Sequence, residues 1–204
     1  MLNSQMADDK NGRENQADRE MQRQREREIE AELQRGDEPE PPVDTSTLAF
    51  FETELDAVAF PATGAEIVET VGDREIEAET GVYTVAELLP ETDVETFESP
   101  AAVRTRIQRP TIASAMKRIV EAAAGIEQAD FRTSQREAYE RTFLELQAID
   151  AVDDDEGISV IRDWIVERID EKGKLPGSRD VRRRAAKYCR ANGYQVSNDE
   201  WLGV

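Results

Sequence analysis

The chain has 204 residues, of which 45 are Asp or Glu and 26 are Lys or Arg, so its formal net charge is −19. Hydrophobic residues make up 38% and charged residues 35%, which supports one or two small domains but not a core along the full length. Histidine is absent and cysteine occurs once. This excludes an intrachain disulfide, Ser-His-Asp and Cys-His catalytic centres, and a cysteine zinc site built by this chain alone.

Residues 1–46 are predicted to form a charged tail followed by a proline-rich linker. Glu and Arg dominate residues 14–35 and favour a solvated helix, which Gly36 would end. The larger apolar residues of this helix are Met21, Ile29 and Leu33. They form too thin a stripe to predict a coiled coil, so we expect a tail that is disordered or helical.

Residues 47–110 are predicted to form a small mixed α/β domain that begins with two helices. The first presents an apolar face at helical spacing and is expected to end at Pro61; the face consists of Leu48, Phe51, Leu55 and Val58. The second starts at Thr63 and stops at Gly72.

The second half of this domain carries turn and cap signals. Apolar and polar residues alternate on both sides of Thr80-Gly81, which predicts a short hairpin. Thr84 and Glu87 match a capping box, in which the side chain at the N-cap and the one three residues later bond to each other's backbone amides. Ser99 before Pro100 predicts the start of a further helix.

Residues 111–204 are predicted to form a helical domain. One helix covers 111–124 and ends at Gly125, and a second opens at Ser134 with Glu137 as a further capping box. A third carries an isoleucine seam at helical spacing, at Ile158, Ile161, Ile165 and Ile169. The predicted fold class is therefore α+β, mostly α, with a small mixed domain before a C-terminal helical layer.

The acidic run before the third helix does not fit a calcium-binding loop. With Gly157 at loop position six, position one is Val152, which has no side-chain oxygen, and position twelve is Asp163 rather than Glu. The run 153–155 is better explained as carboxylates that complement a helix dipole.

The run from Leu55 to Ile107 resembles a small domain of unknown function from uncharacterised haloarchaeal proteins and, more distantly, short bacterial ones. The similarity rests on "FPA", "VGD", "YTVAEL" and the "SP" opening of the next helix. The segments "LPGSRDVRRRAAKYCRANGY" and "NDEWLG" also look like haloarchaeal members, and the acid-rich, Lys-poor composition is similar to that of salt-loving archaea. The resemblance implies lineage and fold, but no activity and no functional residue.

The segment 172–190 departs most from the acidic composition. It holds eight basic residues and one acid, a formal +7, which leaves −26 for the rest of the chain. We predict a helix over 179–191, with Ser178 as N-cap and Asn192-Gly193 as its stop.

A helical wheel divides this helix into two faces. An inner face predicted to lie in the core consists of Val181, Ala185, Tyr188 and Cys189. On the opposite face lies what we call the basic ridge, defined as Arg179, Arg183, Lys187 and Arg190. Arg182 and Arg184 flank the apolar seam, and Lys172 and Lys174 lie in the preceding joint.

Cys189 has two interpretations. Its basic neighbours could lower the pKa of the thiol and make it reactive, or it packs as a small apolar residue beside Val181, Ala185 and Tyr188. The second is favoured, because nothing in the sequence positions a substrate or a resolving thiol.

Three explanations of the basic segment stay open: a solvated or ion-paired face, contact with DNA or structured RNA, and docking onto an acidic protein. The candidate binding residues are Arg179, Arg183, Lys187, Arg190, Arg182 and Lys174. The preceding helix and the joint of about seven residues are also weakly similar to a helix-turn-helix.

The functional hypothesis is a non-catalytic interaction or accessory protein of a halophilic cytoplasm, contacting a nucleic-acid machine through 172–190. The alternative is a DNA-binding transcriptional regulator, and an enzyme of unrecognised type comes third. No cofactor or metal site is expected. We expect no membrane contact and a cytoplasmic protein, since the chain lacks an apolar run of membrane-spanning length and its start lacks the apolar region of a signal peptide. The sequence does not indicate the oligomeric state.

Overall fold

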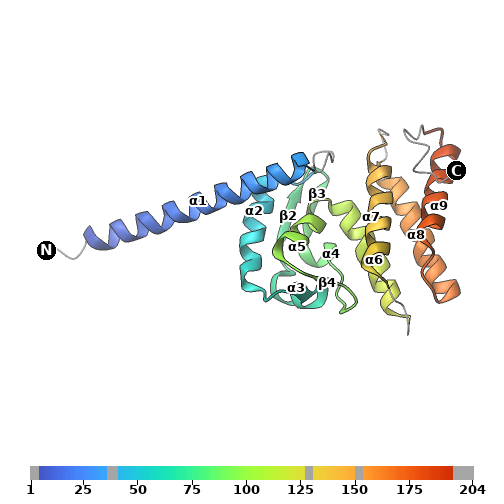
Figure 1. The fold of residues 1–204 in the computed structure, drawn as a ribbon, viewed down its shortest axis with the longest axis horizontal. Coiled ribbons are helices and arrows are strands. Elements are labelled where there is room, and N and C mark those ends of the chain that lie inside the picture. Colours follow the sequence, from blue (N-terminus) through green and yellow to red (C-terminus); the bar gives the residue numbers. More distant parts are fainter. Residues whose placement is uncertain (1–4, 36–40, 127–130, 150–153, 195–204) are drawn as a thin grey trace.

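The structure is a computed structural model, and it describes residues 5–35, 41–126, 131–149 and 154–194. A long N-terminal helix projects from one end, a mixed domain lies in the middle, and four helices form the other end (Figure 1). The elements are α1 (Gln5–Arg35), α2 (Thr45–Glu54), η1 (Leu55–Ala57), β1 (Ala62–Thr63), α3 (Gly64–Val71), β2 (Glu75–Ala78), β3 (Gly81–Thr84), α4 (Val85–Leu88), β4 (Thr96–Phe97), α5 (Pro100–Ile107), α6 (Pro110–Ala124), α7 (Thr133–Gln147), α8 (Asp154–Lys172) and α9 (Ser178–Ala191). The predicted fold class, α+β and mostly α, is confirmed.

Two small antiparallel sheets give the middle domain its β content. β1 pairs with β4, and β2 pairs with β3 in the hairpin predicted around Thr80-Gly81. In the hairpin Ala78 lies opposite Gly81, so the loop is two residues long. Gly81 has φ of +138°, a conformation that residues with a side chain rarely adopt.

Local cap signals located most helix starts correctly. The capping box at Thr84 and Glu87 is formed, and the Ser99 hydroxyl accepts from the Ala102 amide ahead of Pro100. Thr63 also forms a full box, with Glu66, at the helix start that the sequence placed there. The stop at Gly125 is confirmed, whereas α2 gives way to a 3₁₀ turn at Leu55, earlier than the predicted end at Pro61.

Two predicted caps are wrong. The N-cap of α7 is Arg132 rather than Ser134, and that of α9 is Gly177 rather than Ser178, with no side-chain cap bond in either helix. In both cases the helix begins earlier than predicted, so the serine lies inside the first turn. A residue there has helical backbone angles, whereas an N-cap side chain reaches the free amides from an extended backbone. Glu137 therefore has no capping role.

The described residues form two hydrophobic cores, and α6 contributes to both. Ala113 lies in the core of the mixed domain, whereas Met116 and Ile119 lie in the core of the four-helix end. The isoleucine seam of α8 is buried as predicted, with every member at most 3% exposed. Helices α6 to α9 run alternately up and down (Figure 1), with α7 and α8 in the centre and α6 and α9 outside them.

Helix α1 is attached to the mixed domain by its C-terminal half. Ile29 is 2% exposed in the core that α2 and α5 also line, so this part of the predicted helix is docked rather than solvated. Arg25 donates to the Asp56 carboxylate over 2.9 Å. Arg104, whose side chain is 3% exposed, binds Glu52 over 2.9 Å and also pairs with Glu32 of α1. One buried guanidinium thus joins three helices. The predicted stop at Gly36 lies outside the described residues.

No helix in the described part of the chain is long and apolar enough to cross a membrane.

We predict that Thr63→Ala and Thr84→Ala each lower the free energy of unfolding by about 1 kcal/mol, because each removes an N-cap bond. Ser134→Ala is the matched control and should change it by less than about 0.5 kcal/mol. Urea unfolding monitored by circular dichroism measures all three. An equal loss in the control would contradict the assignment of caps.

Arg104→Met should lower the free energy of unfolding by about 2 kcal/mol, because it leaves the Glu52 carboxylate without its cation. It should also speed amide hydrogen exchange in the docked half of α1, since the ion pair with Glu32 is removed. The control is Arg118→Met, at an exposed arginine of α6. Unchanged exchange around Ile29 would show that apolar packing alone holds α1.

Candidate partner-binding surface

The inner face of α9 is part of the bundle core, as predicted. Val181, Ala185 and Cys189 are fully buried, Ala186 is 3% exposed, and Tyr188 is half-buried. Tyr188 packs beside Tyr194, which follows the helix, with ring centroids 6.2 Å apart. The buried face fixes which side of α9 reaches solvent.

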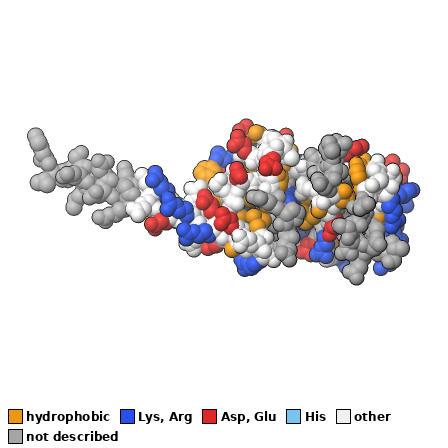
Figure 2. Space-filling view, turned by 90° about the horizontal axis from the view of Figure 1, so that it is seen from above, with side chains coloured by type: hydrophobic (Ala, Val, Ile, Leu, Met, Phe, Trp, Pro, Cys, Tyr) orange, Lys and Arg blue, Asp and Glu red, His pale blue; other side chains and the backbone are white. Residues whose placement is uncertain are grey.

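The basic ridge lies on that solvent side. Arg179, Arg183, Lys187 and Arg190 are all exposed, and none forms an ion pair with a carboxylate among residues that the structure describes. Positions i, i+4, i+8 and i+11 place the four along about 16 Å of helix, at 1.5 Å per residue. Figure 2 shows Lys and Arg side chains gathered at this end of the molecule. The arrangement is a row of cations on a rigid helix, without ion-pair partners in the described part of the chain.

The other two candidate residues lie beside this row. Arg182 is half-buried at the side of α9, and Lys174 is exposed in the joint before it. The joint comprises residues 173–177, five rather than about seven, and α8 and α9 pack side by side in opposite directions (Figure 1). In a helix-turn-helix the two helices instead cross at a steep angle.

Cys189 is a core residue rather than a reactive thiol. It is fully buried, and burial raises its pKa instead of lowering it. Desolvation disfavours the charged thiolate. The interpretation as a small apolar residue is therefore confirmed.

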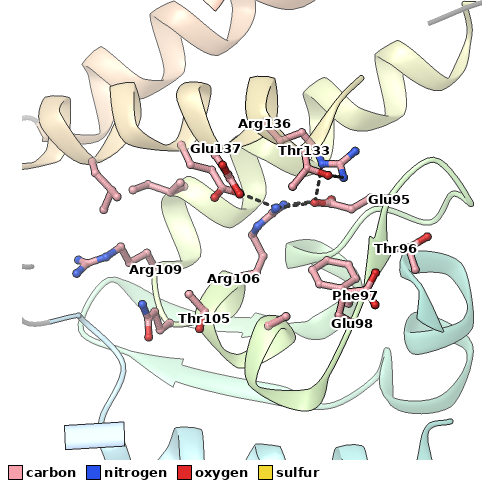
Figure 3. A pocket seen from close by; sticks show the side chains of 15 residues that line it. Glu95, Thr96, Phe97, Glu98, Thr105, Arg106, Arg109, Thr133, Arg136 and Glu137 are labelled. Atoms are coloured by element: carbon pink, nitrogen blue, oxygen red, sulfur yellow. Dashed lines mark hydrogen bonds and ion pairs between the residues drawn. The ribbon is translucent and has the colours of Figure 1, made fainter. Parts of the chain in front are cut away.

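Sequence reasoning missed a second charged site, where the mixed domain meets the bundle. Arg106 of α5 binds Glu95 over 2.6 Å and Glu140 of α7 over 2.5 Å. Arg136 of α7 lies 3.4 Å from the same Glu95. Figure 3 shows Arg106 reaching from α5 toward α7 with Glu95 beside it. We call Glu95, Arg106, Arg136 and Glu140 the junction cluster.

Burial shifts the pKa of one member of this cluster, Glu140. The Glu95 and Arg106 side chains are 4% and 9% exposed. Burial raises the pKa of Glu140 above its ordinary value, although the Arg106 guanidinium opposes the shift. The sequence offers no signal that distinguishes these four residues from the others of their kind, because Glu and Arg occur throughout the chain.

The described residues offer no metal site. Among them, no cluster of three or more Cys, Asp or Glu side chains is arranged to hold a metal ion. The carboxylates of Asp153, Asp154 and Asp155 lie outside the described side chains.

Residues 42–118 match the model of a family of unknown function, DUF5789. The match covers the mixed domain and the first part of α6, and it confirms the predicted resemblance to a domain of unknown function. No curated protein and no solved structure matches the chain.

The raised pKa of Glu140 predicts a pH dependence. A carboxyl whose folded-state pKa lies above its unfolded value favours folding most at low pH, and this contribution disappears as the pH rises through the folded pKa. Glu140→Gln removes the titration while Glu95 still binds Arg106. The free energy of unfolding of the wild type, relative to this variant, should therefore fall as the pH rises from the ordinary carboxyl pKa of 4.5 through the higher folded-state pKa.

Urea unfolding across this pH range measures the effect, and Glu167→Gln on the exposed face of α8 is the control. A wild-type advantage that grows with pH would contradict the assignment.

Proposed function

We propose that the chain is a non-catalytic interaction protein whose basic ridge binds an anionic partner surface, nucleic acid or the nucleic-acid part of a larger complex. The observation that carries the proposal is that the ridge has no ion pair with any carboxylate of the described residues. In a chain with 45 acidic residues, four neighbouring cations are exposed without an ion pair to any described carboxylate. A solvated face that only neutralised the protein's own carboxylates would pair with them.

The chemistry of the ridge supports phosphate as the group it recognises. Three of its four residues are arginines, whose planar guanidinium donates two parallel hydrogen bonds to a phosphate. The inner face of α9 is buried in the bundle, so the donors stand on a helix that does not have to fold on binding. The ordering cost of binding is thereby limited to the side chains.

The overall charge supports a cytoplasm of high salt as the working environment, in agreement with the predicted haloarchaeal lineage. In a chain with a net charge of −19, the acidic side chains repel one another at low ionic strength, and abundant salt screens this repulsion. At about 1 M salt the screening length is about 3 Å, so the ridge would act through direct contacts. The acidic remainder of the chain would then limit binding to the ridge itself.

DNA binding by a transcriptional regulator is the second candidate. It would use the same ridge, but α8 and α9 form an antiparallel helical pair rather than the crossed pair of a helix-turn-helix. For this reason the accessory function stands first.

We predict that changing all four ridge residues to Gln weakens binding to structured RNA or duplex DNA at least about tenfold, because each substitution removes a charge-assisted bond to phosphate. Fluorescence anisotropy at several KCl concentrations measures this. The slope of log K against log salt should also become shallower by about 0.9 for each duplex phosphate that the variant no longer neutralises.

The matched control changes four exposed arginines outside α9 to Gln, at Arg23, Arg27, Arg118 and Arg141. Equal weakening in both variants would mean general charge attraction, and an unchanged ridge variant with an intact fold would overturn the proposal. Purification from the native cells in native salt then identifies the partner: ribosomal or polymerase subunits support the accessory function, and specific DNA fragments support the regulator.

A further inference from the structure

Strand β2 of the hairpin has one edge that no other strand covers in the described structure. β2 pairs only with β3, and the direction of hydrogen bonding alternates from residue to residue along a strand. On the β3 side, the Val85 amide donates to the Arg74 carbonyl over 2.9 Å. On the other side, the Glu79 amide donates to the Pro42 carbonyl over 3.0 Å. The even-numbered residues of β2 therefore bond toward β3, and the odd-numbered ones point outward.

Two residues of this outer edge lack a backbone partner there among the described residues. By the alternation, the amide and carbonyl groups of Glu75 and Glu77 point away from β3, and neither residue bonds through them to any described group. The bond from Glu79 to Pro42 shows that the same edge binds backbone where the chain reaches it. An extended peptide laid along β2 would supply the missing donors and acceptors.

The outer edge of β2 forms one side of an open groove. The groove has a volume of about 630 Å³, and helix α2, which lies beside β2 in Figure 1, supplies Thr47 and Phe50 to its other side. Four large apolar side chains are exposed in the described part of the chain, and two of them line this groove: Phe50, 48% exposed, and Val82, 58% exposed. A segment bound in the groove would therefore bury apolar area as well as pair with the strand.

The charges of the groove favour a basic partner. Its lining has three exposed carboxylates that form no ion pair with a described cation: Asp73, Glu75 and Glu77. Arg74, the one cation of the lining, binds Glu54 over 2.8 Å and lies with its guanidinium 5.0 Å from the centre of the Phe50 ring. Two copies of β2 paired edge to edge would bring their carboxylates together, which disfavours a second copy of this chain. Carboxylates on an edge strand oppose neutral and acidic strands in the same way, but they attract a basic one.

We propose that the groove binds an extended basic segment of a partner protein, which adds to β2 as a third strand. Side chains alternate between the two faces of a strand, so basic residues of the added strand lie beside Glu75 and Glu77. The residues between them lie on the face to which the buried Ile76 side chain points, where they contact Phe50 of α2. The groove belongs to the mixed domain, so this inference does not depend on the function proposed for the basic ridge of α9.

The test uses the full chain and three capped heptapeptides at constant ionic strength. The first alternates lysine and valine, the second has the same sequence with methylated backbone amides, and the third alternates glutamate and valine. Fluorescence anisotropy should give a Kd of about 0.1 mM for the first peptide. The other two should bind at least about tenfold more weakly, because one lacks backbone donors and the other places like charges beside Glu75 and Glu77.

Amide hydrogen exchange followed by NMR locates the bound strand. In the free protein, the amides of Glu75 and Glu77 should exchange at least about tenfold faster than that of Ile76, which bonds to β3. Saturating lysine–valine peptide should remove most of this difference. Slow exchange of Glu75 and Glu77 in the free protein would overturn the proposal: if independent of protein concentration, the chain covers its own edge, and if concentration-dependent, a second copy does.

Two variants test the side chains of the groove. Phe50→Ser removes the apolar contact, and the double change Glu75→Gln with Glu77→Gln removes two of the three carboxylates. Each should weaken binding of the lysine–valine peptide several-fold. All three side chains are exposed, so both variants should keep the fold, which circular dichroism checks.

The matched controls make the same kinds of change outside the groove. Val94→Ser alters another exposed apolar residue, and Glu98→Gln with Glu167→Gln removes two exposed carboxylates. Both controls should bind the peptide as the wild type does. Equal weakening in controls and groove variants would contradict the proposal, as would equal binding of the methylated or the acidic peptide.

Discussion

The shared helix α6 is the constraint on which the rest of the structure depends. Ala113 packs into the core of the mixed domain, and one turn later Met116 and Ile119 pack into the core of the bundle. Because both sets project from one rigid helix, the two cores cannot turn independently without exposing buried apolar area. The family match ends at residue 118, within this helix.

The junction cluster also constrains how the mixed domain and the bundle are placed relative to each other. An ion pair taken out of water stabilises little unless its geometry is good, but a mismatched arrangement leaves a buried charge unpaired. Arg106 satisfies two carboxylates that come from opposite sides of the junction, so one relative placement of α5 and α7 is favoured over others.

The proposal for α9 rests on cations that the described part of the protein leaves without carboxylate partners. A phosphate-bearing partner would supply the negative charge that these cations lack among the described residues.

The sequence by itself determined the features that depend on neighbouring residues. Four features follow from helical or strand periodicity and from bonds within three or four residues: the hairpin, the cap at Thr84, the isoleucine seam and the two faces of α9. For this reason all six candidate binding residues could be placed in or beside α9. Ser134 shows the limit, since its capping pattern is present but α7 begins at Thr133, one residue ahead of it. Only the tertiary structure decided the docking of α1 and the junction cluster. Both features join residues that lie tens of positions apart in the sequence. In a chain so rich in Glu and Arg, burial and distance in the folded protein decide which charges pair, and the spacing of residues along the sequence does not show this.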